Sequence, residues 1–230
     1  NIMNVGGIIK THSSKKNLIS DTIALVLSSK FGVGNSFFRT SNSEKRIFVE
    51  TVPFGGFKKE IFEIVGLFNE DEPRNEDLEL NDRIIKAGYK IVLIPELESI
   101  YYSRSTFKSF FYQAFDNGFI VTRKIGTSEI FHKVRHFIPM LFNIFLITLI
   151  SFYFIADDTY IFKFFLSILF LYIFLNLIFS TINTYNNKNL FYLISMPLLY
   201  FVLHFSYGLG SIFGLFTAIK LKLKKGIMPQ

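Results

Sequence analysis

Carboxylates gather between residues 70 and 79, and their types and spacing suit acid–base chemistry. The sequence there reads Glu70-Asp71-Glu72 and then Glu76-Asp77-Leu78-Glu79. One such carboxylate at the start of a helix, directed into a cleft, can act as a general base. An ordinary helix start with solvated charges is an alternative interpretation, because acidic residues in a first turn favour the helix dipole. The cluster alone leaves both interpretations open.

A helix over 75–87 must position these carboxylates. Asn75 suits its N-cap, and Gly88 suits the position just beyond its C-terminus. Residues 89–94 are expected to form a strand that Pro95 ends, and Tyr101 and Tyr102 are expected on another short strand.

Further elements are expected upstream. Residues 20–31 have an apolar helical face, with Ser20 as the N-cap and Gly32 at the end. Residues 46–52 alternate as a strand, and residues 59–65 suit a short helix closed by Gly66. Between them lies the turn Pro53-Phe54-Gly55-Gly56-Phe57, where the backbone can approach a ligand closely. A plain structural loop explains this turn equally well.

Charge almost vanishes between Phe137 and Ile219, where the four exceptions are Asp157, Asp158, Lys163 and Lys188. A helix of about 20 residues covers a hydrocarbon core of about 30 Å. The apolar blocks are 137–156, 160–181 and 190–219. The third is too long for one simple span, and we expect Pro197, Gly208, Gly210 and Gly214 to kink or break it.

Basic residues flank this apolar region on both sides: Arg123, Lys124, Lys133 and Arg135 before it, and Lys220, Lys222, Lys224 and Lys225 after it. Both flanks should be cytoplasmic by the positive-inside rule, which requires an even number of crossings. Either the third block is re-entrant or broken, or the C-terminus breaks the rule. Residues 106–124 carry aromatic side chains at helical spacing and predict an amphipathic helix at the membrane interface.

The net charge of the chain is +7, and basic residues gather in these flanks. There is no basic stripe with a recognisable module that would suggest nucleic acid as a partner. The chain has no cysteine, which excludes disulfides and a thiol nucleophile. His132 and His136 have a spacing that could hold a metal, but an interfacial role is favoured. His204 is expected to form a hydrogen bond between helices.

Several motifs follow one another in a characteristic order. They are Gly34-Asn35-Ser36-Phe37-Phe38-Arg39, Thr51-Val52-Pro53-Phe54-Gly55-Gly56-Phe57-Lys58-Lys59-Glu60, Val65-Gly66-Leu67-Phe68-Asn69-Glu70, Asn75-Glu76-Asp77-Leu78-Glu79-Leu80-Asn81-Asp82-Arg83 and Ala87-Gly88-Tyr89-Lys90-Ile91. This series resembles the acceptor-side half of a family 2 glycosyltransferase with the GT-A fold. It looks most like the membrane-attached bacterial enzymes of succinoglycan-type exopolysaccharide assembly. The resemblance covers roughly residues 5 to 125 and extends loosely to His204-Phe205-Ser206-Tyr207-Gly208-Leu209-Gly210.

The resemblance implies an α/β fold class, with a partial, Rossmann-like GT-A head followed by an α-helical transmembrane region. With the charge pattern, it divides the chain into four parts. These are the acceptor-side part of the glycosyltransferase domain (1–105), an interfacial helix and linker (106–136), transmembrane helices (137–219) and a basic cytoplasmic tail (220–230).

The implied function is an inverting transfer of a sugar from a nucleotide sugar to a lipid-linked or other saccharide acceptor in bacterial surface or exopolysaccharide synthesis. The enzyme would be a multi-pass protein of the cell membrane, held in the lipid bilayer with its head in the cytoplasm. A non-catalytic membrane-anchored scaffold or a degenerate paralogue is the alternative. A transporter is disfavoured, because the tail has few charged residues to form a pathway.

By the same resemblance, Asp77 is the catalytic base and Glu76 shapes the site. Phe54, Gly55 and Gly56 would line a sugar pocket. Gln113 occupies the place of a Gln-x-x-Arg-Trp signature, but Gln113-Ala114-Phe115-Asp116-Asn117 lacks the Arg and Trp, so a processive synthase is not expected. Arg104, or else Arg123 or Lys124, would meet the pyrophosphate.

Related enzymes bind the nucleotide and a divalent metal, Mg²⁺ or Mn²⁺, with an N-terminal half that ends in Asp-x-Asp. No such motif precedes residue 50 here. The resemblance therefore implies that this chain is a C-terminal fragment with no metal ligands of its own, that Asp-x-Asp lies upstream of Asn1, and that the fragment alone is inactive.

Overall fold

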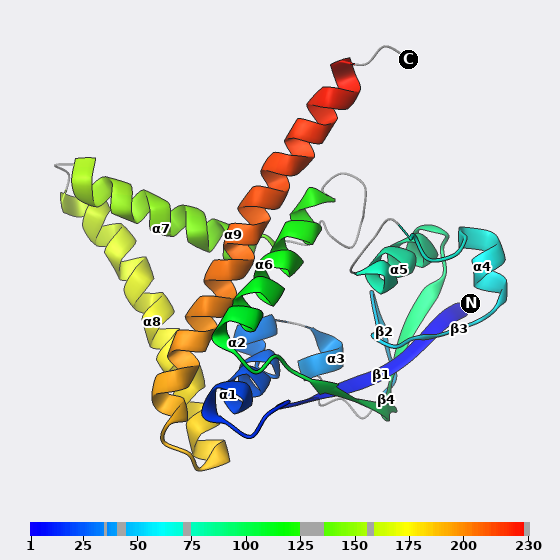
Figure 1. Ribbon diagram of the computed structural model, residues 1–230, viewed down its shortest axis with the longest axis horizontal. Coiled ribbons are helices and arrows are strands. Elements are labelled where there is room, and N and C mark those ends of the chain that lie inside the picture. Colours follow the sequence, from blue (N-terminus) through cyan, green and yellow to red (C-terminus); the bar gives the residue numbers. More distant parts are fainter. Residues whose placement is uncertain (35, 41–44, 71–74, 125–135, 156–158, 228–230) are drawn as a thin grey trace.

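The computed structural model describes residues 1–34, 36–40, 45–70, 75–124, 136–155 and 159–227, and these form a mixed α/β head beside a helical tail (Figure 1). Elements of the head are β1 (Ile2–His12), α1 (Leu18–Leu27), α2 (Lys30–Val33), α3 (Phe37–Thr40), β2 (Ile47–Val49), β3 (Gly56–Phe57), α4 (Glu60–Val65), α5 (Glu76–Lys86), β4 (Lys90–Tyr102) and α6 (Phe107–Arg123). The tail consists of α7 (Ile138–Ile155), α8 (Thr159–Asn187) and α9 (Tyr192–Ile227). The predicted fold class, an α/β head followed by a helical region, is confirmed.

The described sheet has the strand order β2-β4-β1-β3. Its central strands β1 and β4 are parallel, and the edge strands β2 and β3 pair antiparallel to them. β1 was not predicted from the sequence, because Gly6-Gly7 weakens the strand pattern. Gly7 is required there, since a Cβ at this position would overlap the Leu97 carbonyl of β4.

Pro95 does not end the strand as predicted, because β4 continues to Tyr102. The ladder with β1 shifts register between Gly6, which pairs with Leu93, and Ile8, which pairs with Glu98. Pro95 falls within this irregularity, where its missing N–H group costs no regular ladder bond.

Two predicted helix starts are wrong in detail. The helix expected over 20–31 is divided into α1 and α2, and Asn17 rather than Ser20 caps α1 by accepting a hydrogen bond from the Ser20 N–H. Ser29 caps α2, and Gly34 rather than Gly32 follows its end. Asn75 precedes α5 in a left-handed conformation and makes no side-chain cap. The predicted role of Gly88 is confirmed: its φ is +83°, and its N–H donates to the Ile85 carbonyl.

The three apolar blocks correspond to α7, α8 and α9, but the third block is not broken. α9 is one continuous helix that includes Pro197. Its glycines do not break the helix but allow close packing against other helices. A Cβ on Gly210 would overlap the Phe115 carbonyl of α6, and a Cβ on Gly118 of α6 would overlap the Tyr207 carbonyl. These glycines let two backbones approach closely, as small residues do in helix pairs. Thr122 adds a 2.7 Å hydrogen bond from its Oγ1 to the Ser211 carbonyl.

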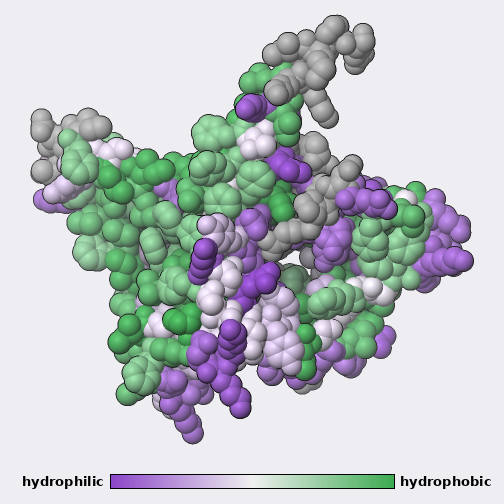
Figure 2. All heavy atoms as spheres, in the orientation of Figure 1, coloured by the Kyte–Doolittle hydropathy of each residue, from purple (hydrophilic) through white to green (hydrophobic). Residues whose placement is uncertain are grey.

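Two segments, Tyr160–Asn187 and Tyr192–Leu223, are long and apolar enough to cross a membrane, and Ile138–Phe154 is a shorter apolar helix. Hydrophobic side chains gather over α7 and α8 at the left of Figure 2, and hydrophilic ones over the head at the right. The predicted tail is thus supported by helix length and composition.

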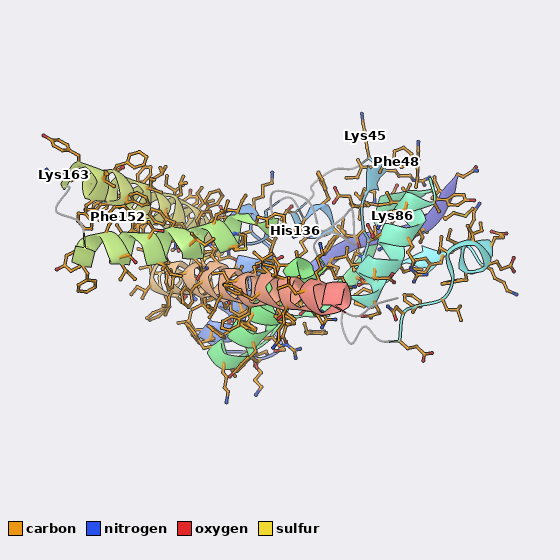
Figure 3. The ribbon with its side chains drawn as sticks, turned by 90° about the horizontal axis from the view of Figure 1, so that it is seen from above. Lys45, Phe48, Lys86, His136, Phe152 and Lys163 are labelled. Carbon is orange, nitrogen blue, oxygen red and sulfur yellow. The ribbon has the colours of Figure 1, made fainter. Side chains whose placement is uncertain are left out.

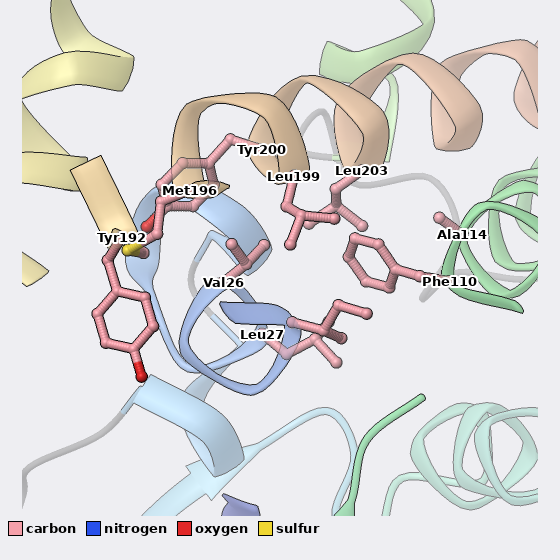
Figure 4. Close-up of a cluster of buried hydrophobic side chains, with 10 residues drawn as sticks. Val26, Leu27, Phe110, Ala114, Tyr192, Met196, Leu199, Tyr200 and Leu203 are labelled. Carbon is pink, nitrogen blue, oxygen red and sulfur yellow. The ribbon is translucent and has the colours of Figure 1, made fainter. Parts of the chain in front are cut away.

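Head and tail share one hydrophobic core (Figure 4). Phe110 of α6 points towards Leu199 and Leu203 of α9, and α1 contributes Val26 and Leu27. The predicted hydrogen-bonding role of His204 is confirmed, because its Nε2 lies 2.9 Å from the Phe31 carbonyl and its Nδ1 lies 3.1 Å from the Tyr172 hydroxyl. His136 lies 3.3 Å from the Tyr207 hydroxyl, whereas His132 is outside the described residues. A second core beneath α4 and α5 belongs to the head alone.

We expect Gly210→Ala to destabilise the protein. Alanine is intrinsically favoured over glycine in a helix by about 1 kcal/mol, but its methyl group would force α6 and α9 apart, and overpacking costs about 1–3 kcal/mol. Thermal unfolding in detergent measures the difference. Thr217→Ala, towards the outside of the same helix, is the matched control and should change stability by less than about 0.5 kcal/mol. A Gly210→Ala protein as stable as the wild type would contradict close packing at this position.

Candidate functional site

Asp77 lies in the first turn of α5, as predicted. Arg83 fixes this helix to the loop before it: its guanidinium pairs with both carboxylate oxygens of Glu79, at 2.9 and 2.8 Å, and also donates to the Val65 and Leu67 carbonyls. The loop can present both carbonyls because Gly66 has a φ of +81°. A bidentate pair with extra carbonyl acceptors uses most of the fork of donors that arginine offers.

The Asp77 carboxyl is half-buried, whereas its neighbour Glu76 is exposed. Burial raises the pKa of Asp77 above its ordinary value, the Leu78 N–H bond to Oδ1 at 2.8 Å opposes this, and the Glu76 charge raises the pKa again. A carboxylate with a raised pKa is a stronger base than a solvated one. The electrostatics of Asp77 thus suit proton abstraction.

Gly55 is packed against a buried amide. A Cβ on Gly55 would overlap Asn4 Oδ1 of β1, so the missing side chain makes room for Asn4. Gly56 is different, since a Cβ there would make only ordinary contacts of 3.7 and 3.8 Å with Val5. Gly56 also borders an open surface hollow of about 480 Å³ with Phe57 and Lys58. The structure therefore shows a packing role for Gly55, and the sugar pocket of Gly55, Gly56 and Phe54, which is 71% exposed, stays a prediction.

A buried polar chain connects this turn to the helix of Asp77. Asn4 Nδ2 donates to Asn81 Oδ1 at 2.6 Å, and Asn81 Nδ2 donates to Thr51 Oγ1 at 2.9 Å. Asn4 and Asn81 are both 0% exposed. Asn81 is four residues after Asp77 and hence on the same side of α5. These residues were not predicted from the sequence as part of the site. Their signal was a polar residue, Asn81, within the apolar stripe of the predicted helix.

Gln113 lies in a second group of residues, away from Gly55. Its Nε2 donates to the Tyr101 hydroxyl at 2.7 Å, and the Arg39 guanidinium lies 4.7 Å from the centre of the same ring. Arg39 also donates to Thr11 Oγ1 at 2.9 Å, and burial lowers its pKa from the ordinary value. Tyr101 pairs with Thr11 of β1. Thr11 is seven residues from Asn4, or about 23 Å along a strand. The structure thus separates Gln113 from the Gly55 turn.

Arg104 is exposed and follows the end of β4. It borders an open, polar hollow of about 440 Å³ with Ser14, Ser103, Thr106 and Ser109. This hollow lies at the carboxyl ends of the parallel strands β1 and β4, the edge where open α/β sheets bind ligands. Arg104 is therefore accessible to an anion, but it belongs with the second group rather than with the Gly55 turn.

Among the described residues, no cluster of three or more His, Cys, Asp or Glu side chains is placed to hold a metal ion. The Mg²⁺ or Mn²⁺ expected for the complete protein stays a prediction, since its Asp-x-Asp ligands are expected upstream of Asn1, and none of the chemistry below passes through it.

Comparison with known proteins identifies relatives of this chain. It is 33% identical over 115 residues, half of the chain, to the dolichyl N-acetyl-alpha-D-glucosaminyl phosphate 3-beta-D-2,3-diacetamido-2,3-dideoxy-beta-D-glucuronosyltransferase of Methanococcus voltae. It is 34% identical over 95 residues, 41% of the chain, to the succinoglycan biosynthesis protein ExoA of Rhizobium meliloti (strain 1021). The matched segments cover 34% and 28% of these relatives, so the chain spans well under half the length of either. No protein-family model matches the chain.

These relatives confirm the resemblance predicted from the ordered motifs. One relative is named as a glucuronosyltransferase and the other as a succinoglycan biosynthesis protein, consistent with a family 2 glycosyltransferase. The roles of the individual site residues stay predictions.

Asn81→Leu is expected to destabilise the head by about 1–3 kcal/mol, because it leaves the buried Asn4 amide without its acceptor. The double variant Asn4→Leu/Asn81→Leu should lose less stability than the sum of the two single variants, since both polar partners are then replaced by apolar groups. Unfolding in detergent measures all three variants, and additive losses would show that the two amides are not coupled.

Proposed function

We propose that these residues form the acceptor side of an inverting glycosyltransferase with a GT-A fold. The enzyme moves a sugar from a nucleotide sugar to a saccharide acceptor in the synthesis of surface or exopolysaccharide. The names of both relatives support this class of reaction. The observation that carries the proposal is Asp77, a half-buried carboxylate with a raised pKa in the first turn of α5.

Asp77 acts as the general base. Its carboxylate accepts the proton of an acceptor hydroxyl while that oxygen attacks the anomeric carbon of the donor sugar. The bond between this carbon and the phosphate oxygen breaks in the same step, the nucleoside diphosphate leaves, and the configuration inverts. The Leu78 N–H bond to Oδ1 orients the carboxylate, and the exposed Glu76 carboxylate lies next to it in the chain.

The acceptor is proposed to be linked to a lipid. The name of the Methanococcus relative includes a dolichyl phosphate sugar, which supports this acceptor class. The apolar helices α7 and α8 would hold the head at the cell membrane, in a multi-pass arrangement with the head cytoplasmic. A lipid-linked saccharide would then present its hydroxyl group beside the head. Arg104, at the carboxyl ends of the central strands, is proposed to meet a phosphate group.

Asp77→Asn should abolish transfer, because an amide cannot accept the proton. The full-length protein that contains these residues is assayed in membranes, with a panel of nucleotide sugars as donors and the endogenous lipid-linked saccharides as acceptors. Rates should fall by at least about 100-fold, the lower end of what general-base catalysis contributes. Asn69→Ala, in the exposed loop before α5, is the control and should retain activity and expression. Transfer at the wild-type rate by Asp77→Asn would remove Asp77 from this role.

The pH dependence of kcat/KM gives an independent test. The base works when it is deprotonated, so the rate should fall as the pH falls through the pKa of Asp77. Because burial raises this pKa, the acidic limb should lie above the ordinary aspartate value of about 3.9. Glu76→Gln removes a nearby negative charge and should move the limb to lower pH. Glu60→Gln, on the exposed surface of α4, should leave it in place; equal shifts in both variants would argue against Asp77 as the titrating group.

A further inference from the structure

The tail helices meet the head in different ways. α9 packs against α1 and most extensively against α6, whereas the described parts of α7 and α8 pack mainly against α9 and each other. Figure 1 shows α9 running beside α6, with α7 and α8 diverging from it on the side away from the strands. α9 therefore lies between the head and the other two tail helices.

The side chains of α9 show the same layering. The side that faces α1 and α6 is buried and includes Met196, Leu199, Tyr200, Leu203 and Ser211. The opposite side presents exposed apolar side chains at helical spacing in two groups, Ile194, Leu198 and Phe201 before Gly208 and Phe216, Ile219 and Leu223 after it, which together we call the apolar stripe. α7 packs against the same side between the two groups, where a Cβ on Gly208 would overlap the Pro139 carbonyl. α7 and α8 reach α9 through Asn143, which donates to the Phe205 carbonyl, and Asn176, which donates to the Pro197 carbonyl. α9 is apolar all round because different neighbours cover its different sides.

The depth of α9 in a bilayer is limited by α6. Charged residues are distributed along the whole of α6, from Lys108 through Asp116 to Arg123. The glycine contacts hold this helix against the middle of α9, from Tyr207 to Gly214. If α9 crossed the hydrocarbon core, α6 would carry its charges into it, and charged side chains facing lipid are expensive.

α7 and α8 have no such restriction. α7 has 18 residues without a charge, or about 27 Å of helix, close to the hydrocarbon thickness of about 30 Å. Ring contacts of Phe165 with Phe145 and Phe152 hold the two helices together. Figure 3 shows Phe152 and Lys163 at the far end of this pair, opposite Lys45, Phe48 and Lys86 of the head.

We propose that α7 and α8 cross the bilayer as a hairpin, while α9 lies along the membrane surface on the side of the head with its apolar stripe towards the lipid. Exposed Lys188 before α9 and exposed Lys220 and Lys222 towards its end then meet the same layer of anionic headgroups. Two crossings also place both basic flanks of the tail on one side, which resolves the conflict with the positive-inside rule. The inference rests on the proposed membrane attachment but not on transfer activity.

Single cysteines test this arrangement cleanly, because these 230 residues contain none. Exposed positions are chosen in the head (Lys16→Cys), at the end of α8 (Asn186→Cys), towards the end of α9 (Lys222→Cys) and at the start of α8 (Tyr160→Cys), where the side chain is 83% exposed. A membrane-impermeant maleimide is applied to spheroplasts and to inside-out vesicles of cells that express the full chain. Phe174→Cys, exposed in the middle of α8, is the control for a lipid-facing position.

We expect Lys16→Cys, Asn186→Cys and Lys222→Cys to react from the same side, Tyr160→Cys to react from the opposite side, and Phe174→Cys to react from neither. Labelling of Asn186→Cys and Lys222→Cys from opposite sides would mean that α9 crosses, and would overturn the inference. Labelling of Tyr160→Cys from the side of Lys16→Cys, or from neither side, would overturn the crossing hairpin. Recovery of the chain in the soluble fraction would instead refute the proposed membrane attachment itself.

Discussion

The close approach of α6 and α9 is the contact on which the arrangement of head and tail depends. Glycines on both helices bring backbone against backbone, so a single added methyl group at Gly118 or Gly210 would overlap a carbonyl of the other helix. With α6 held there, Phe110 enters a core completed by Leu199 and Leu203 of α9. α9 is thus part of the head's own core as well as part of the tail.

The protein has two cores with different tasks. One joins α1 and α6 to the tail, and the other supports α4, α5 and the start of the sheet, where Asp77 lies. The long parallel strands β1 and β4 connect them: Asn4 of β1 contacts the Asp77 side, and Thr11 contacts Arg39 beside α6. The sheet thus joins the core shared with the tail helices to the core beside Asp77.

Local signals in the sequence predicted where Asp77 lies in its helix, but not what surrounds it. Asp77 in a first turn and Gly88 at a positive φ follow from the chemistry of helix ends, which depends on a few neighbouring residues. The packing of Gly55 against Asn4 could not be predicted, because the two residues meet only when β1 lies beside the turn. The prediction that Pro95 ends the strand was wrong for the same reason. The effect of a proline depends on whether the hydrogen-bond ladder with the neighbouring strand, here β1, is regular at that point.

The sequence by itself determined that an acidic helix start belongs to a mixed head and that an uncharged, Phe-rich region follows it. Hydrophobicity and charge are properties of the residues, and they survive any arrangement of the elements. Only the tertiary structure decided that the third apolar block is an unbroken helix shared by head and tail. Composition reports how much apolar surface a helix has. Which side is covered by protein and which is left for lipid depends on distant partners such as α6, whose charges limit where α9 can lie.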